Sequence, residues 1–175
     1  MGQLHYDLFP TPMGWFAAVV SHVGLRYASM KPTPEAAMES LDSHLSGVEH
    51  SPERLLEIKD AVLGLLSGER ADLDDLTLDI DDAPKFHRAA WEACRSIPLG
   101  ETRSYAWLAA QAGRPRAYRA AGQAMARNRV VLVVPCHRVI GSDGGLQGYG
   151  AGGLAVKDRL LKIEVGLRHR LQTPP

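Results

Sequence analysis

Residues 130–139 read Val-Val-Leu-Val-Val-Pro-Cys-His-Arg-Val, and this stretch decides how the rest of the chain is interpreted. Five aliphatic residues followed by a proline predict a buried strand that ends at one fixed place. The residue after that proline is Cys136, next to His137 and Arg138. Cationic neighbours lower the pKa of a thiol, so the arrangement predicts a nucleophile. A Cys-His pair alone is a weak sign, because a cysteine in apolar surroundings is more often structural.

The composition is that of an ordinary globular protein. The 175 residues are 45% hydrophobic and 23% charged, and no apolar run approaches the roughly 20 residues that cross a bilayer. Residues 1–5 have neither a basic region nor an apolar core, so we expect no signal peptide. These features predict a cytoplasmic protein, nucleoid-associated in a prokaryote.

The chain has two cysteines, Cys94 and Cys136. Without a secretory signal, we expect both thiols to be reduced. There is no Cys-x-x-Cys motif and no pair of histidines at ligand spacing, so we expect no metal site. Cys94 lies among apolar residues of a predicted helix and is interpreted as a core thiol.

Charge is distributed unevenly along the chain. Residues 1–83 contain 5 Lys/Arg and 15 Asp/Glu, a balance of −10, whereas residues 84–175 contain 15 and 5, a balance of +10. Segment 102–142 has seven arginines and no acidic residue. A solvated helical surface normally mixes both signs, and the planar guanidinium suits phosphate. The second half therefore predicts a surface that faces a polyanion.

The first half predicts a small antiparallel sheet with two helices. Alternating segments bounded by turns predict strands at residues 4–9, 15–21 and 25–30, with a turn at 10–14. Thr33-Pro34-Glu35 and Ser51-Pro52-Glu53 each combine an N-cap with a proline at the first helical position. They predict helices that end at Gly47 and Gly68.

An acidic stretch separates the two halves. It contains a predicted short strand at residues 76–80, and it lacks the glycine and terminal glutamate of a calcium loop. It is interpreted as a solvated linker. Because Pro84 ends the stretch, the predicted domains are 1–83 and 84–175.

The second half predicts a series of helices, at residues 86–97, 105–112, 117–126 and from 153 onward. Ser104 can cap the second of these, and a Gly-Arg-Pro-Arg break precedes the third. A helix, a turn with glycine and a small-residue helix form the helix-turn-helix pattern. Small residues are equally typical of a packed interior helix, but the basic surroundings favour contact with nucleic acid. Glu164 is expected near the end of the last helix, and residues 168–170 in a frayed tail.

Several spaced motifs carry a family resemblance. They are IPLGETRSY at 97–105, RAAG at 119–122, Asn128 and PCHRV at 135–139. The chain resembles the O6-alkylguanine-DNA alkyltransferases, also called methylated-DNA–protein-cysteine methyltransferases. The resemblance is continuous from about Phe86 to Gly166 and looser over the first 80 residues.

This resemblance implies a mixed α+β fold, with an N-terminal ribonuclease H-like antiparallel sheet with helices and a helical C-terminal domain. The C-terminal domain would hold the helix-turn-helix and the active-site cysteine. The implied activity is direct-reversal DNA repair: an alkyl group moves from O6-alkylguanine, or less readily O4-alkylthymine, to the protein's own cysteine. No cofactor is implied, and each molecule acts once. The implied partner is double-stranded DNA carrying O6-alkylguanine, bound in its minor groove by a monomer, with cooperative binding left open.

Catalytic roles carry over residue by residue. By resemblance, Cys136 is the alkyl acceptor, His137 relays the thiol proton through a water, and Glu164 orients the histidine. Asn128 is similar to the asparagine that ties the helix-turn-helix to the active-site turn. Tyr105 resembles the tyrosine that crowds the phosphate and hydrogen-bonds the guanine ring.

The remaining roles concern DNA and the pocket. By resemblance, Arg119 enters the duplex in place of the extruded nucleotide, and Lys157 lies near the leaving oxygen. The other expected DNA contacts are Tyr105, Ala117, Ala120, Ala121, Gly122, Gln123, Arg103, Arg116, Arg129 and Arg138. The expected pocket walls are Met125, Val139, Tyr149, Gly150 and Ala151.

The sequence departs from the family pattern at two places. Arg129 stands where relatives usually have proline, and it is interpreted as an added phosphate contact. Residues 149–154 form a stretch one residue longer than usual. This leaves open whether the amide of Gly150 or of Ala151 meets the guanine oxygen, and how large an alkyl group fits.

Three functions other than DNA repair by alkyl transfer are less consistent with the sequence. An alkyltransferase-like damage sensor lacks the acceptor cysteine, which Cys136 supplies here. A cysteine hydrolase rarely has its nucleophile and base adjacent in sequence. A helix-turn-helix regulator needs base-reading side chains, and the second helix offers mostly alanine. Transfer of a labelled alkyl group from DNA to Cys136 distinguishes all of them.

Overall fold

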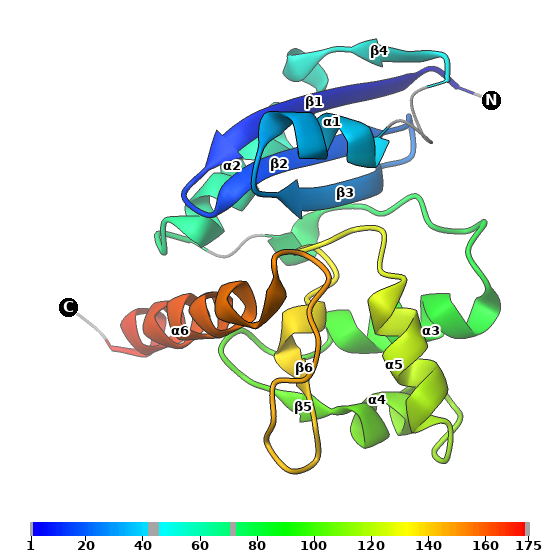
Figure 1. The fold of residues 1–175 in the computed structure, drawn as a ribbon, viewed down its shortest axis with the longest axis vertical. Coiled ribbons are helices and arrows are strands. Elements are labelled where there is room, and N and C mark those ends of the chain that lie inside the picture. The colour runs from blue at the N-terminus through cyan, green and yellow to red at the C-terminus, as the bar shows by residue number, and fades with distance from the viewer. Residues whose placement is uncertain (1, 42–45, 71–72, 174–175) are drawn as a thin grey trace. The chain divides into compact units, whose positions relative to one another are not determined.

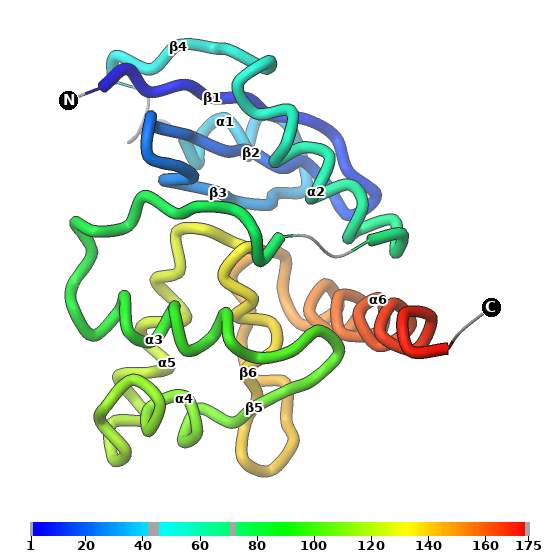
Figure 2. Tube along the Cα trace, turned by 180° about the vertical axis from the view of Figure 1, so that it is seen from behind, coloured from blue at the N-terminus to red at the C-terminus, as the bar shows by residue number. Residues whose placement is uncertain are grey.

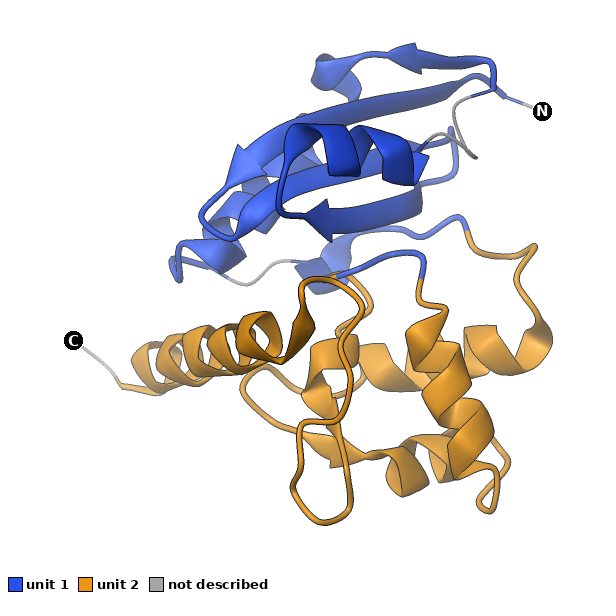
Figure 3. Ribbon diagram, viewed as in Figure 1, with its two compact units in different colours: residues 1–79, 129–131 blue, residues 80–128, 132–175 orange. Residues whose placement is uncertain are grey.

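The structure, a computed structural model, describes residues 2–41, 46–70 and 73–173. It consists of two compact units (Figure 3). Unit 1 comprises Met1–Asp79 and Arg129–Val131, and unit 2 comprises Ile80–Asn128 and Leu132–Pro175. Residues 129–131, which follow three of the unit 2 helices in the sequence, thus belong to unit 1. That residues 1–83 and 84–175 are separate domains stays a prediction.

Unit 1 is built on a four-stranded sheet (Figure 1). Its strands are β1 (Leu4–Thr11), β2 (Gly14–Val20), β3 (Leu25–Lys31) and β4 (Val48–His50), in the order β3-β2-β1-β4. The first three pair antiparallel, as predicted. The three-residue β4, which was not predicted, pairs parallel with β1 and makes the sheet mixed. The predicted turn is also shorter, because β1 continues through Thr11, which pairs with Gly14.

Two helices cover opposite faces of this sheet (Figures 1 and 2). Helix α1 (Pro34–Leu41) packs Ala37 and Leu41 on Ala17 and Val19 of β2. The Thr33 hydroxyl accepts a hydrogen bond from the Ala36 amide, as an N-cap does. On the other face lies α2 (Leu56–Leu66), preceded by a 3₁₀ turn, η2 (Pro52–Leu55). The predicted continuation of the first helix over residues 42–45 lies outside the described residues.

The predicted strand at residues 76–80 was wrong. A short 3₁₀ turn, η3 (Leu73–Asp75), is followed by a single bridge between Leu25 and Leu78. Asp79 was also wrongly placed in a solvated linker. Its amide donates to Leu25 O, and its Oδ2 accepts from the Ser21 hydroxyl at 2.6 Å and from Arg26 Nη1 at 3.1 Å. The carboxylate therefore fastens the 76–79 segment to the sheet.

Residues 130–134 are buried, but they do not form the predicted strand. All five side chains are at most 9% exposed. Val130 makes one bridge to Ala28, and the chain then turns, with Leu132 in the left-handed region at a φ of 71°. An uninterrupted apolar run indicates burial but has no period that distinguishes a ladder from an irregular core segment.

Unit 2 contains four helices within the described residues: α3 (Lys85–Arg95), α4 (Tyr105–Gln111), α5 (Tyr118–Ala126) and α6 (Gly153–Gln172). Ser104 Oγ accepts from the Trp107 amide at the start of α4, as predicted. A two-residue parallel ladder that was not predicted joins β5 (Arg103–Ser104) to β6 (Val139–Ile140). No helix in the described part of the chain is long and apolar enough to cross a membrane.

Helix α6 is longer than predicted, so Glu164 lies near its middle. The expectation of a frayed tail at residues 168–170 was wrong, because they are helical. Arg168 Nη2 forms an ion pair with Glu101 Oε1 at 2.9 Å, which holds this part of the helix to the segment before β5.

Replacing Asp79 tests the fastening of the 76–79 segment. We expect Asp79→Ala to lower the free energy of unfolding by about 2 kcal/mol, since it leaves Ser21 and Arg26 without their charged acceptor. Asp81 is a matched control, because its side chain is 98% exposed and its ion pair with Arg88 lies at the surface. Asp81→Ala should cost at most about 1 kcal/mol. Urea unfolding measures both, and equal losses would contradict the assignment.

Candidate active site around Cys136

Cys136 begins a 3₁₀ turn, η4 (Cys136–Arg138), that follows Pro135. The thiol-bearing residue is only 9% exposed, yet it lines a cavity of about 490 Å³. The other lining residues are Tyr105, Gly122, Met125, Ala126, Gly148, Tyr149 and Gly150. Helices α4 and α5 and the segment before α6 thus each contribute a wall. The volume lies within the range of pockets that enclose small ligands.

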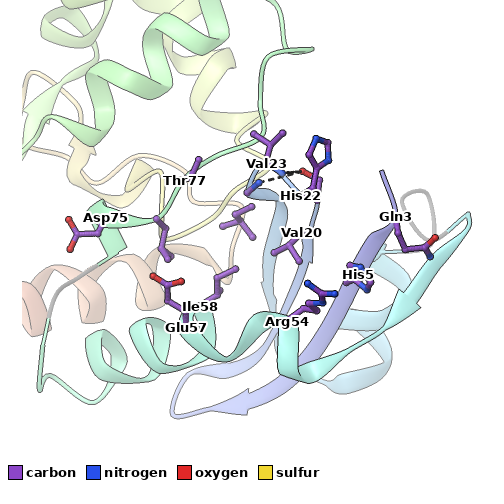
Figure 4. A pocket seen from close by; sticks show the side chains of 14 residues that line it. Gln3, His5, Val20, His22, Val23, Arg54, Glu57, Ile58, Asp75 and Thr77 are labelled. Carbon is purple, nitrogen blue, oxygen red and sulfur yellow. Dashed lines mark hydrogen bonds between the residues drawn. The ribbon is translucent and has the colours of Figure 1, made fainter. Parts of the chain in front are cut away.

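A cavity of about 520 Å³ in unit 1 offers less chemistry (Figure 4). Its lining mixes both signs of charge, with His5, Arg54, Glu57 and Asp75 among its residues. No cysteine lines it. The candidate active site is therefore the Cys136 cavity of unit 2.

Asn128 connects the end of α5 to the cysteine turn. Its Nδ2 donates to Val134 O at 2.8 Å and to Cys136 Sγ at 3.2 Å. Its backbone amide donates to Met125 O. One side chain therefore fixes both the path of the chain into η4 and the position of the sulfur.

The environment of Cys136 does not lower its pKa, contrary to the sequence prediction. Burial raises the pKa of this thiol, and it outweighs the opposing hydrogen bond from Asn128 and the charge of Lys157. His137 and Arg138, which follow Cys136 in sequence, do not lower its pKa, because their side chains bind Glu164 instead. The sulfur is a neutral thiol at pH 7 and needs a base to become a nucleophile.

His137, Arg138 and Glu164 form a buried charged cluster. His137 Nε2 lies 2.7 Å from Glu164 Oε1. Arg138 donates from Nε to Glu164 Oε2 at 2.9 Å and from Nη2 to Oε1 at 3.0 Å, and its Nη1 donates to Ile97 O at 2.7 Å. Burial acts to raise the pKa of Glu164, but the charges and hydrogen bonds of His137 and Arg138 lower it to about 2. Glu164 is therefore ionised at neutral pH.

An ionised Glu164 decides which nitrogen of His137 can act as a base. The carboxylate accepts from Nε2–H, so the unprotonated lone pair of a neutral ring is at Nδ1. Among the described residues, neither His137 Nδ1 nor Tyr149 Oη has a hydrogen-bond partner, although both atoms are buried. The two rings meet edge to face, with centroids 6.4 Å apart. His137 Nδ1 is thus the free basic atom of the cluster.

Lys157 is buried, and its ammonium group binds two backbone carbonyls. Its Nζ donates to Val139 O at 2.7 Å and to Leu146 O, which ties α6 to β6 and to the segment after it. Burial lowers the pKa of Lys157. It does not line the Cys136 cavity, and neither do Val139 and Ala151, which are buried. Of the predicted pocket walls, Met125, Tyr149 and Gly150 line it, together with Tyr105.

Two of the residues predicted to contact DNA are buried in this structure. Ala121 is fully buried against the interior, and Arg138 is 5% exposed with its guanidinium held by Glu164 and Ile97. That these two residues contact DNA stays a prediction. By contrast, Arg116, Arg119 and Gln123 are exposed, and Ala117, Ala120 and Gly122 are partly exposed.

Two further arginines are already engaged. Arg103 donates from Nη2 to Glu101 Oε2 at 2.7 Å and lies over the Trp107 ring. Arg129 donates from Nη2 to Asp79 O at 3.2 Å within unit 1. Sequence reasoning did not single out Gly148 or Ala126 as cavity walls. It also missed that Arg138 is a partner of Glu164, because that contact spans 26 residues.

Comparisons with known proteins point to one family. Residues 85–166 match the family model described as 6-O-methylguanine DNA methyltransferase, DNA binding domain. A methylated-DNA–protein-cysteine methyltransferase of Methanosarcina acetivorans is 35% identical over 164 residues, 92% of this chain and 98% of that relative. One from Methanosarcina barkeri is 50% identical over 91 residues, 50% of this chain and 57% of the relative. The Mycobacterium tuberculosis protein OGT, solved in complex with DNA, superposes with a TM-score of 0.78 at 33% identity, covering 93% of this chain and 94% of that one.

The charged cluster predicts a specific pH dependence of stability. The folded pKa of Glu164 is about 2, below its ordinary value of 4.5. Its contribution is therefore complete above about pH 4.5 and is lost as the pH falls through about 2, an expected loss of about 3 kcal/mol. Glu164→Gln has no such titration, so the stability difference between wild type and variant should shrink as the pH falls from about 5 to about 2. A difference independent of pH, measured by urea unfolding, would contradict this account.

Proposed function

The chain belongs to the methylated-DNA–protein-cysteine methyltransferase family, and from this premise we propose that it repairs O6-alkylguanine in DNA by taking the alkyl group onto Cys136. One observation carries the proposal. The Cys136 sulfur opens on a cavity of about 490 Å³, beside a buried histidine whose second nitrogen is held by an ionised carboxylate. O4-alkylthymine would be a poorer substrate of the same reaction.

The reaction we propose is an in-line displacement at the alkyl carbon. The thiol proton leaves Cys136 for His137 Nδ1 through a water, the sulfur attacks the carbon, and the bond from that carbon to O6 breaks. The guanine then gains a proton from the Tyr105 hydroxyl in the same cavity, and the proton held by His137 returns to Tyr105 through water, so that both side chains end as they began. Because burial raises the pKa of the thiol, the coupled base matters more here than for a pre-ionised sulfur.

The product of this displacement is a thioether. A thioether offers water no leaving group, so the cysteine is not regenerated and each molecule acts once. No cofactor takes part in a direct transfer from oxygen to sulfur. Alignment of sulfur, carbon and oxygen supplies much of the acceleration, and the hydrogen bond from Asn128 to the sulfur supports that alignment.

The substrate base has to leave the duplex to reach this cavity. A base inside a duplex is stacked and paired, and extrusion costs a few kcal/mol. We infer that α5 lies in the minor groove and that Arg119, exposed on its first turn, fills the place of the extruded nucleotide. The arginines of segment 102–142 that remain exposed would bind phosphates. The DNA complex of the M. tuberculosis relative supports DNA as the partner.

The presence of Cys136 in the cavity argues against the non-transferring sensor. A sensor needs a pocket for the base but no acceptor atom, whereas here the sulfur is held in the pocket by Asn128. A sequence-specific regulator would leave the buried base, carboxylate and thiol without a use.

Alkyl transfer is tested by intact mass. After incubation with a duplex containing O6-methylguanine, we expect the wild-type protein to gain the mass of one methyl group, on Cys136. Cys136→Ala should gain nothing and still shift the duplex in a gel. Cys94→Ala is the control, because Cys94 is fully buried and does not line the cavity, so this variant should be methylated. Methylation of Cys136→Ala would show that another residue is the acceptor.

The role of Arg119 is tested by comparing substrates. We expect Arg119→Ala to slow methyl transfer from duplex DNA by about tenfold or more, because the gap left by the base is no longer filled. Transfer from a free O6-alkylguanine base, which needs no extrusion, should change much less. Arg170→Ala removes the same charge from α6 and controls for weaker attraction to DNA. Equal losses on duplex and free base would mean that another residue drives extrusion.

A further inference from the structure

A second cavity of about 490 Å³ adjoins the Cys136 cavity in unit 2. We propose that it is a subsite for the nucleotide next to the damaged one on the same strand, and that Tyr118 stacks on the base of that nucleotide. The proposal rests on the proposed function and adds a binding residue to it. The residues that line this cavity include Tyr105, Tyr118, Gly122, Ser142 and Gln147.

The two cavities are neighbours that share part of their lining. Tyr105 and Gly122 line both of them. Gly122 has no side chain, and a Cβ at that position would lie 3.9 Å from Cδ1 of the Tyr105 ring. The Tyr105 ring and the helix backbone at Gly122 therefore form part of the boundary between the cavities. A nucleotide whose base occupies the Cys136 cavity is joined by a single phosphodiester to its neighbour, so the neighbour has to lie near this boundary.

The chemistry of the second cavity suits a nucleotide. Tyr118 is the first residue of α5 and is 52% exposed, which leaves its ring available for stacking. Base–aromatic stacking tolerates every base, as repair at any sequence requires. Ser142 and Gln147 also line the cavity and supply a hydroxyl and an amide, groups suited to sugar and phosphate oxygens.

Charge around the cavity agrees with a strand of DNA as occupant. Arg119 follows Tyr118 directly, Arg116 lies two residues before it, and both are exposed. Segment 102–142, which contributes most of the lining, has no acidic residue, and the carboxylate of Asp143, directly after it, accepts a hydrogen bond from the Gly145 amide at 3.0 Å. Phosphates on either side of the stacked base would therefore meet guanidinium groups.

Single-stranded oligonucleotides provide the sharpest test, because they contain no gap for a wedge to fill. The readout is a ratio of two rate constants. The first is for methyl transfer from an oligonucleotide containing O6-methylguanine, and the second is for benzyl transfer from free O6-benzylguanine. We expect Tyr118→Ala to lower this ratio about tenfold. Tyr118→Phe keeps the ring and should stay within about twofold of wild type. The ratio removes any general effect on folding or on Cys136.

A second arm locates the partner base. Oligonucleotides with an abasic nucleotide on one side of the lesion should slow the wild-type protein about tenfold for one side only. Tyr118→Ala should show no further loss on that oligonucleotide, because the two changes remove the same contact.

Three outcomes would overturn the proposal. A loss in Tyr118→Ala confined to duplex DNA would make the tyrosine a wedge beside Arg119. An equal loss with free O6-benzylguanine would make the cavity a site for bulky alkyl groups. If the rate reduction caused by the abasic nucleotide adds to the reduction in Tyr118→Ala, the missing base and the Tyr118 ring do not contact each other. Failure of the proposed function looks different, since wild-type protein would then transfer no alkyl group from any substrate.

Discussion

The burial of the Glu164 carboxylate is the constraint on which the rest of unit 2 depends. A buried charge costs several kcal/mol unless donors surround it. Here the donors come from η4, through His137 and Arg138, and the same arginine reaches back to Ile97 O. The carboxylate comes from the middle of α6. Satisfying one charge thus fixes a helix, the cysteine turn and the segment after α3 against each other.

The same cluster gives the histidine and the cysteine different hydrogen-bonding environments. Glu164 holds one nitrogen of His137, which leaves the other as the available base. For Cys136, by contrast, burial raises the pKa of the thiol by more than the hydrogen bond from Asn128 and the charge of Lys157 lower it. Under the proposed single-use reaction this combination is advantageous. A neutral thiol reacts slowly with stray electrophiles and oxidants, and it becomes nucleophilic only when the base and an aligned substrate are both present.

Sequence reasoning succeeded where the signal is local and failed where it depends on distant partners. The capped starts at Thr33 and Ser104 follow from a few neighbouring residues, and both hydroxyls accept the expected amide. The run at 130–134 was correctly seen as buried but wrongly as a strand, because continuous hydrophobicity does not reveal pairing. The pKa of Cys136 was wrong for a related reason. Residues adjacent in sequence need not be adjacent in space, and Arg138 turns its charge to a carboxylate 26 residues away.

Helix α5 shows how small side chains can serve two surfaces at once. On its inner side, Ala121 and Ala124 are fully buried, and the indole Nε1 of Trp91 donates to Ala124 O at 2.9 Å, a contact that a larger residue there would obstruct. On its outer side, Gly122 forms part of the boundary between the two cavities, while Tyr118 and Arg119 stand exposed at its start. The two readings of an alanine-rich helix, packed interior or open contact surface, are therefore compatible. Tight packing inside brings the helix close to the cysteine, and under the proposed function the small residues on its outer side would leave room for a strand of DNA.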